Sequence, residues 1–259
     1  MLFGFGLWQL LALFGTGLAA GFVDSIAGGG GLLTLPVLLS LGLEPKYALG
    51  TNKLQATCGS GSAAFHYGRA GAVHWKDCVR GFVVTLIGAA LGTAAVQSIS
   101  TEILKRLLPP LLLAIAIYML VKPELGKQDH APRMPRSRFD LIFGLGLGFY
   151  DGFLGPGTGT FWTMAFVLAL GFNMTRATAH TKVMNLASNL SSLAFFLILG
   201  KLYFVAGAAM GLGQLLGARL GAGLVIKRGT KLIRPIFISM VLLLIVKLIY
   251  SSYLTGGQK

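Results

Sequence analysis

The chain has 259 residues, of which 54% are hydrophobic and only 12% are charged. Soluble domains carry about 25% charged residues, so this composition, with a mean hydropathy of +0.74, excludes an ordinary globular enzyme. A helix that spans a bilayer needs about 20 mainly apolar residues. We therefore expect an all-α polytopic membrane protein with roughly eight to ten apolar segments of helical length.

The basic residues outnumber the acidic ones, 22 to 8, which gives a formal net charge of +14. In a soluble protein this balance would suggest nucleic acid. Here the basic residues gather in short segments between apolar runs, a pattern that orients membrane proteins through cytoplasmic Lys and Arg. The bilayer, not nucleic acid, is the expected partner. Cys58 and Cys78 form no CxxC and the four histidines are scattered, so we expect no metal site and no cofactor.

The apolar stretches fall into two sets of five. The first basic residue is Lys46, whereas a secretory signal needs a basic start, so the first stretch is predicted to be a retained span with an external N-terminus. Residues 1–121 form a first transmembrane repeat, 122–138 a basic cytoplasmic linker, and 139–259 a second repeat. The stretches are 4–26, 30–43, 47–68, 78–97 and 104–121, then 139–155, 158–171, 177–199, 202–225 and 235–254.

The two sets are copies of one another. Gly21–Asp24 recurs as Gly148–Asp151, and Thr51–Lys53 is matched by His180–Lys182. The same register continues through Gly88–Gly92 and its counterpart in the second set, which chance repetition of apolar composition would not maintain. An internal repeat of this kind is typical of secondary transporters.

The basic residues indicate that the copies are inverted. Arg69, Lys76 and Arg80 follow the third stretch, whereas its counterpart is followed only by Lys201, and the asymmetry reverses after the fourth stretch. An inverted pair with both termini outside satisfies this distribution. The short stretches 30–43 and 158–171 leave two options, because about 14 helical residues reach only about 21 Å: they cross fully or they are re-entrant.

Glycine interrupts each copy at the same place. Gly28–Gly31 and Gly155–Gly159 should unwind the helix, since interior glycines cost roughly 1 kcal/mol each, and unwound backbone inside a bilayer must face protein or a watery cavity. Amides at the following helix starts favour an anion. The candidate binding residues here are Gly29, Gly30, Gly157 and Thr158. The alternative is a tight turn or a close helix crossing.

Lys53 and Lys182 lie inside otherwise uncharged stretches at equivalent repeat positions. An ionisable group within a membrane segment is by default a functional hypothesis. Polar neighbours at helical spacing extend each lysine into a stripe. In the alternatives, each lysine extends to the nearer interface or pairs structurally with Asp24 or Asp151. The remaining candidates of the stripes are Thr51, Asn52 and Gln55 in the first copy, and Thr181, Asn185 and Asn189 in the second.

Asp24, Asp151 and His180 are the candidate proton carriers. The two aspartates lie well inside apolar stretches and could bind a coupling proton, or they could cap the glycine breaks. His180 could titrate near neutrality, or it could be a packed core histidine.

At these residues the chain resembles the TauE/SafE sulfite exporter family, also called toluene sulfonate uptake permeases, and most of all its YfcA-like branch. The motifs are GFVDSIAGGGGLLTLP (21–36), ALGTNKLQA (48–56), GFYDGFLGPGTG (148–159), ATAHTKVMNLASN (177–189) and GQLLGARLGAGLV (213–225). The resemblance covers nearly the whole chain. It implies a multi-pass transporter of the bacterial inner membrane that carries small, often sulfur-containing anions, driven by the proton gradient.

Three hypotheses follow. The first is a secondary transporter that binds a small anion between the glycine breaks and the two lysines, alternating between states open to either side. The second is an integral membrane enzyme acting on a lipid or small thiol, although we find no nucleophile beside a base. The third is a scaffold, which would not need buried lysines. The cargo, the direction, the coupling ion and the oligomeric state, a homodimer included, stay open.

Overall fold

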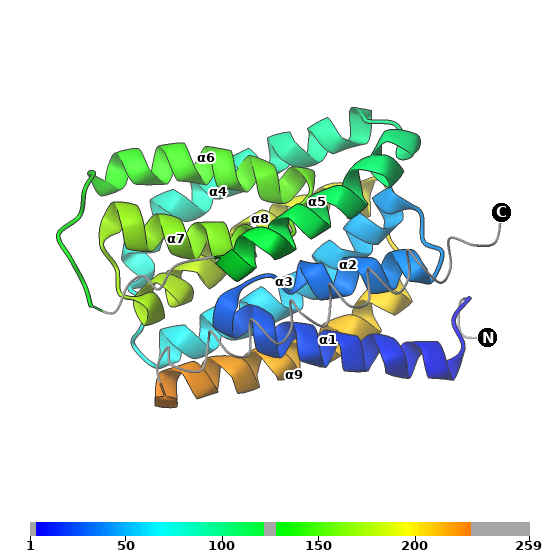
Figure 1. The fold of residues 1–259 in the computed structure, drawn as a ribbon, viewed down its shortest axis with the longest axis horizontal. Helices are drawn as coiled ribbons and strands as arrows, with labels where there is room; N and C mark the ends of the chain where they lie inside the picture. The colour runs from blue at the N-terminus through cyan, green and yellow to red at the C-terminus, as the bar shows by residue number, and fades with distance from the viewer. Residues whose placement is uncertain (1–3, 122–127, 229–259) are drawn as a thin grey trace.

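The computed structural model describes residues 4–121 and 128–228, and in these parts of the chain every regular element is a helix (Figure 1). The helices fall into a set of five before the connector and a set of four after it. Their bounds are α1 Leu7–Ala27, α2 Gly31–Ser40, α3 Pro45–Arg69, α4 Trp75–Ser98, α5 Thr101–Val121, α6 Arg136–Phe153, α7 Thr158–Leu170, α8 Met174–Ile198 and α9 Phe204–Arg228. The predicted stretch 235–254 lies outside the described residues.

Three of the described helices, α1, α4 and α9, are long and apolar enough to cross a membrane, while α2 and α7 are shorter apolar helices. Their outer faces carry large exposed hydrophobic side chains at helical spacing, which a soluble protein avoids. One such stripe follows α4 and another follows α9. The stripes are Val79, Val83, Ile87 and Leu91 on α4, and Leu212, Leu216 and Leu220 on α9.

Both glycine breaks end a helix, as predicted. α1 ends at Ala27 and α2 begins at Gly31, while α6 ends at Phe153 and α7 begins at Thr158. Gly28 and Gly29 have φ values of 80° and 92°, and Gly155 and Gly157 have 94° and 78°. Only glycine adopts this left-handed backbone at little cost, so the helices stop where the sequence supplies it.

The halves exchange helices with each other. α1 packs along α9, and α6 packs along α4, so each half covers the first helix of the other. α3 packs on α9 and α8 packs on α4. The result is two bundles, which we call the first bundle (α1, α3 and α9) and the second bundle (α4, α6 and α8). The central helices α3 and α8 pack against each other where the two bundles meet.

Glycine makes the exchanged contacts close. A Cβ atom added to Gly17 would lie 2.0 Å from the Met210 carbonyl oxygen, and one added to Gly92 would lie 2.0 Å from the Phe149 carbonyl oxygen. Backbones that approach this closely gain dispersion contact along their length. Gly17 and Gly92 are therefore points of close helix packing, one inside each bundle.

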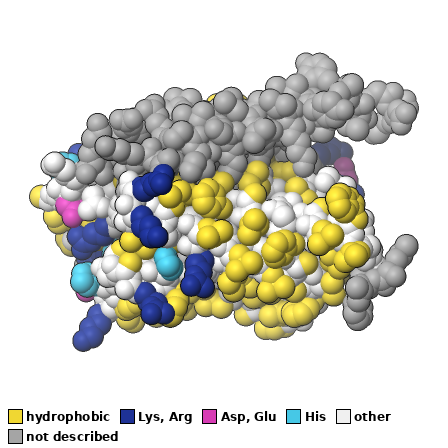
Figure 2. Space-filling view, turned by 90° about the horizontal axis from the view of Figure 1, so that it is seen from below, with side chains coloured by type: hydrophobic (Ala, Val, Ile, Leu, Met, Phe, Trp, Pro, Cys, Tyr) yellow, Lys and Arg dark blue, Asp and Glu magenta, His cyan; other side chains and the backbone are white. Residues whose placement is uncertain are grey.

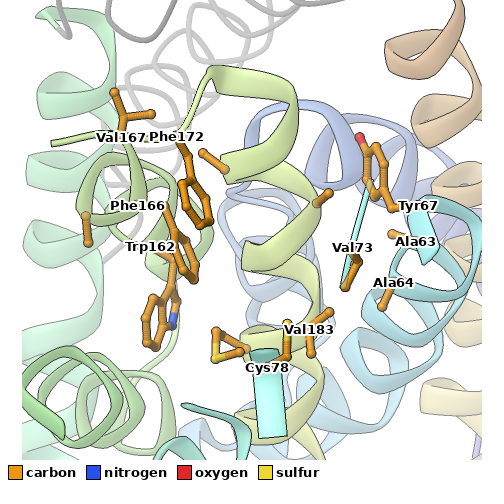
Figure 3. Packing of buried hydrophobic residues seen from close by; sticks show 14 of the residues in the cluster. Ala63, Ala64, Tyr67, Val73, Cys78, Trp162, Phe166, Val167, Phe172 and Val183 are labelled. Carbon is orange, nitrogen blue, oxygen red and sulfur yellow. The ribbon is translucent and has the colours of Figure 1, made fainter. Parts of the chain in front are cut away.

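Aromatic side chains fill the core beside α7. Trp162 and Phe166 stack with ring centroids 5.5 Å apart, and Phe166 stacks on Phe172 at 5.6 Å. Figure 3 shows these three rings on one side of the cluster and Tyr67 on the other. This core fixes α7 against α8 and so holds the second glycine break in place.

Basic side chains gather at one end of the molecule. Figure 2 shows Lys and Arg concentrated at one end of the visible face, with many hydrophobic side chains on the described surface beyond them. At this end α3 and α9 finish and α4 begins. Their exposed basic residues include Arg69, Lys76, Arg80, Lys227 and Arg228.

We predict that Gly92→Ala destabilises the protein by about 1–3 kcal/mol, the usual effect of overpacking, because the new methyl would meet the backbone of α6. The matched control is Gly146→Ala on α6, whose added Cβ would meet nothing within 4 Å. Unfolding of the two purified variants in detergent measures the difference. Equal stability would mean that the α4 and α6 backbones are not in close contact.

Candidate functional site

The polar stripes of α3 and α8 lie at the centre of the molecule. Both predicted lysines are buried, with Lys53 1% exposed and Lys182 fully covered. Extension of these lysines to an interface, one of the alternatives, is therefore not what the structure shows. Each ammonium group needs a counter-charge at this depth.

Each lysine pairs with the aspartate of the other half. The Lys53 Nζ lies 2.8 Å from Asp151 Oδ1, and the Lys182 Nζ lies 2.9 Å from Asp24 Oδ2. Lys53 belongs to the first bundle and Asp151 to the second, while Lys182 belongs to the second and Asp24 to the first. Both ion pairs therefore connect the two bundles.

The surrounding groups complete these pairs. The Lys53 ammonium also donates to the Asp151 carbonyl oxygen at 2.6 Å and to Asn189 Oδ1 at 3.3 Å. The Ser188 hydroxyl donates to the second oxygen of Asp151. Asp24 Oδ1 accepts from the Gly30 amide at 3.0 Å. Asp24 thus caps the first glycine break and neutralises Lys182 at the same time.

The two glycine breaks touch each other. A Cβ atom added to Gly28 would lie 2.7 Å from the Gly159 carbonyl carbon, and the Thr160 hydroxyl donates to the Ala27 carbonyl oxygen at 3.1 Å. Because no side chain separates them, the start of α7 lies against the segment that joins α1 to α2.

A small polar pocket lies at this meeting point. Its volume is about 40 Å³, room for roughly three water molecules at 10–15 Å³ each. The first turns of both α2 and α7 line it, together with side chains of α1, α3, α6, α8 and α9. The lining residues are Asp24, Gly29, Gly30, Gly31, Asn52, Ala56, Asp151, Gly155, Gly157, Thr158, Gly159, Asn185, Asn189 and Gln214.

The pocket lining differs in charge from the sequence-based expectation. We predicted two lysines facing one cavity. In the structure both ammonium groups lie behind the aspartates, and Asp24 and Asp151 are the ionisable side chains that line the pocket. The formal charges of the two pairs cancel, so the site with all four groups ionised is neutral.

Most of the predicted residues come together here. Gly29, Gly30, Gly157, Thr158, Asn52, Asn185 and Asn189 all line the pocket. Gln55 is not in the lining but contacts it, because its Nε2 donates to Oδ1 of the lining residue Asn52 at 2.7 Å. Thr181 lies 3.1 Å from the Thr163 hydroxyl of α7.

Thr51 and His180 make their contacts away from the pocket and the ion pairs. The Thr51 hydroxyl donates to the Tyr47 carbonyl oxygen and accepts from the Tyr203 amide, so it fastens the start of α9 to α3. The His180 ring contacts Phe166 and Phe172, and its Nδ1 lies 2.9 Å from the Arg176 carbonyl oxygen. These contacts correspond to the packed core histidine that we left as the alternative.

Gln214 is the pocket residue that sequence reasoning missed. It lies on α9 and is 2% exposed. Its Oε1 and the Asn185 Oδ1 are both buried without a hydrogen-bond partner in the structure, an arrangement that proteins avoid unless a ligand or water supplies the bond. The available signal was a single amide side chain within a glycine-rich apolar stretch.

Among the described residues, no group of three or more His, Cys, Asp and Glu side chains is arranged to hold a metal ion. The groups that line the pocket or lie beside it are carboxylates, amides, helix-start backbone and paired lysines. Such groups bind and release small polar ions and protons.

Comparison with known proteins identifies the chain. The model of the family described as sulfite exporter TauE/SafE matches residues 13–248. The chain belongs to the TauE/SafE family. No solved structure matches it significantly.

Curated relatives of this TauE/SafE protein are bacterial. A probable membrane transporter protein of Haemophilus influenzae is 46% identical over 95% of this chain and 97% of its own length. The probable membrane transporter protein YfcA of Escherichia coli is 44% identical over 93% and 90%, and the probable membrane transporter protein ORF9 of a Sinorhizobium species is 42% identical over 93% of each. Family and relatives together support a membrane transporter.

We predict that Lys53→Ala and Asp151→Ala each destabilise the protein by about 3–5 kcal/mol, because each leaves one buried charge without its partner. The double variant should lose less than the sum of the two. Unfolding in detergent micelles gives all three free energies. The exposed pair Arg106 and Glu102 is the control, with single losses below about 1 kcal/mol. Additive losses at Lys53 and Asp151 would contradict the pairing.

Proposed function

We propose that this protein is a secondary transporter of small sulfur-containing anions, such as sulfite or organosulfonates, coupled to protons. The observation that carries the proposal is the polar pocket where two glycine breaks meet between two buried Lys–Asp pairs. Transport is also what the names of the relatives state for those proteins.

The pocket has the groups that bind an anion. The starts of α2 and α7 line it, and a helix start carries partial positive charge and backbone N–H donors. The amides of Asn52, Asn185 and Asn189 add side-chain donors. Lys53 and Lys182 stand directly behind the lining. The volume matches an ion of a few heavy atoms, the size of sulfite or of a sulfonate head group.

The proposal includes two inverted repeats. It is supported by the reciprocal packing, in which α1 meets α9 and α6 meets α4, and by the reciprocal ion pairs. The basic end seen in Figure 2 is then the cytoplasmic face of a bacterial inner membrane. The short apolar helices α2 and α7 are the re-entrant candidates of each repeat.

The moving bodies in this mechanism are the two bundles rather than the two sequence halves. Glycine contacts hold α1 to α9 and α4 to α6, so each bundle is closely packed within itself. The ion pairs and the glycine breaks lie between the bundles. A rocking motion would open the pocket to one side and then the other, and it would break and remake the Lys–Asp pairs.

The aspartates are the proton carriers of the proposal. Asp24 and Asp151 are the ionisable residues of the pocket lining, and protonation of either removes the charge that holds a lysine across the bundle boundary. His180 is not assigned this role, since it packs among aromatic rings away from the lining. Nothing in the pocket specifically favours the alternative of a membrane enzyme.

We predict that Lys53→Ala and Lys182→Ala each reduce transport of sulfite or a sulfonate in proteoliposomes by at least about tenfold. Each substitution removes a buried positive charge that stabilises the bound anion. The control is Lys201→Ala, whose ammonium donates to Gln97 Oε1 outside the pocket. Flux is measured with labelled substrate in vesicles with equal protein content. Undiminished flux in both pocket variants would refute the site.

A further inference from the structure

We infer that the pocket binds its anion together with protons, one for each negative charge, so that this chain is an anion–proton symporter. An inward proton gradient would then drive uptake of the anion. The inference rests on the proposed function and adds the stoichiometry and the direction.

The first argument is charge. Two ammonium groups and two carboxylates meet at the pocket, and no other ionisable residue is among those that line it in the described structure. An anion that entered this neutral site alone would leave an uncompensated negative charge in an apolar interior, which is strongly unfavourable. A proton taken up by Asp24 or Asp151 restores neutrality.

The second argument is hydrogen bonding. A lysine ammonium has three donors, and Lys53 directs three contacts to Asp151 Oδ1, the Asp151 carbonyl oxygen and Asn189 Oδ1. An anion must displace one of these acceptors to bind this lysine. Protonation of Asp151 weakens the acceptor that holds the ammonium most strongly, so the proton and the anion bind in support of each other.

In the described part of the chain, each of these carboxylates forms an ion pair with one lysine. Lys182 of α8 contacts Asp24, and Lys53 of α3 contacts Asp151. The phenol of Tyr67 donates to the Ser25 carbonyl oxygen and that of Tyr150 to the Pro156 carbonyl oxygen. The helices packed on α1 and α6 contribute neutral groups, with Gln214 of α9 in the lining and Thr93 of α4 donating to the Gly152 carbonyl oxygen.

An antiporter would need the opposite arrangement. In an antiporter the anion and the proton occupy the site in turn. Here each ionised aspartate is already paired with a lysine. An incoming anion would therefore compete with that carboxylate for the same ammonium group. The same logic makes transport of a monovalent anion electroneutral, because one proton accompanies it.

The test uses the purified protein in liposomes and methanesulfonate, the anion of a strong acid, which carries one negative charge at every pH used. Any proton that moves with it is therefore bound by the protein. The first measurement is exchange of labelled for unlabelled methanesulfonate at equal pH on both sides. Absence of exchange would refute the proposed function for this substrate class, whatever the coupling.

The second measurement imposes a pH difference with the outside acidic. A one-to-one symporter accumulates the anion about tenfold at equilibrium for each unit of pH difference, and a membrane potential set with potassium and valinomycin leaves this ratio unchanged. Exchange without such accumulation, accumulation only with the inside acidic, or accumulation that follows the potential would each overturn the symport inference while leaving transport intact.

The aspartate variants then locate the coupling. Asp24→Asn and Asp151→Asn should each lose the tenfold accumulation, because removal of one carboxylate charge leaves a lysine charge that balances a monovalent anion without a proton. Asp140→Asn is the matched control: Asp140 is also buried and paired, with Arg136 at 2.9 Å, but lies outside the pocket lining. Size-exclusion chromatography confirms that each variant is folded. Retained accumulation in both pocket variants would overturn the assignment to these carboxylates; the wild-type measurement tests symport by itself.

Discussion

The need to neutralise four charges inside an apolar protein governs the whole structure. Lys53 and Lys182 are buried at the centre, where an unpaired ammonium would cost several kcal/mol. Each finds its counter-charge on a helix of the opposite bundle. The register in which the bundles meet brings both aspartates within reach of the lysines, and the pocket lies beside the two pairs. In the mechanism that we propose, anion binding, gating and proton coupling follow from the same electrostatic requirement.

Glycine serves this requirement in two ways. Within the bundles it allows α1 to approach α9, and α4 to approach α6, at backbone contact. At the breaks it lets the chain stop and restart a helix, with positive φ at Gly28, Gly29, Gly155 and Gly157. The first use makes each bundle closely packed, and the second delivers helix starts and a capped carboxylate to the pocket. A side chain at either kind of site would separate surfaces that must touch.

The repeat register and the polarity pattern predicted much of this arrangement. Equivalent motifs identified both lysines, both aspartates and both breaks as one set, and the structure brings them together. Sequence reasoning could not say which aspartate pairs with which lysine. Each pair joins the two halves of the chain, and its formation depends on the packing of α4 and α9 against the opposite half. Sequence reasoning also placed the lysines in the lining rather than behind Asp24 and Asp151. Gln214 was missed because a single amide in a glycine-rich stretch carries no periodic signal. Thr51 was included because its helical spacing suits the polar stripe, but its hydroxyl holds the start of α9 instead.

The exchange of helices also bears on how such a chain could arise. A first half on its own would have α1 without α9 and α4 without α6, and its lysine would face no partner carboxylate in the opposite bundle. Two separate copies that associated head to tail in the bilayer could supply each other with both. With the halves inverted, as we propose, the chain has the architecture of an antiparallel dimer whose two subunits are joined into one polypeptide.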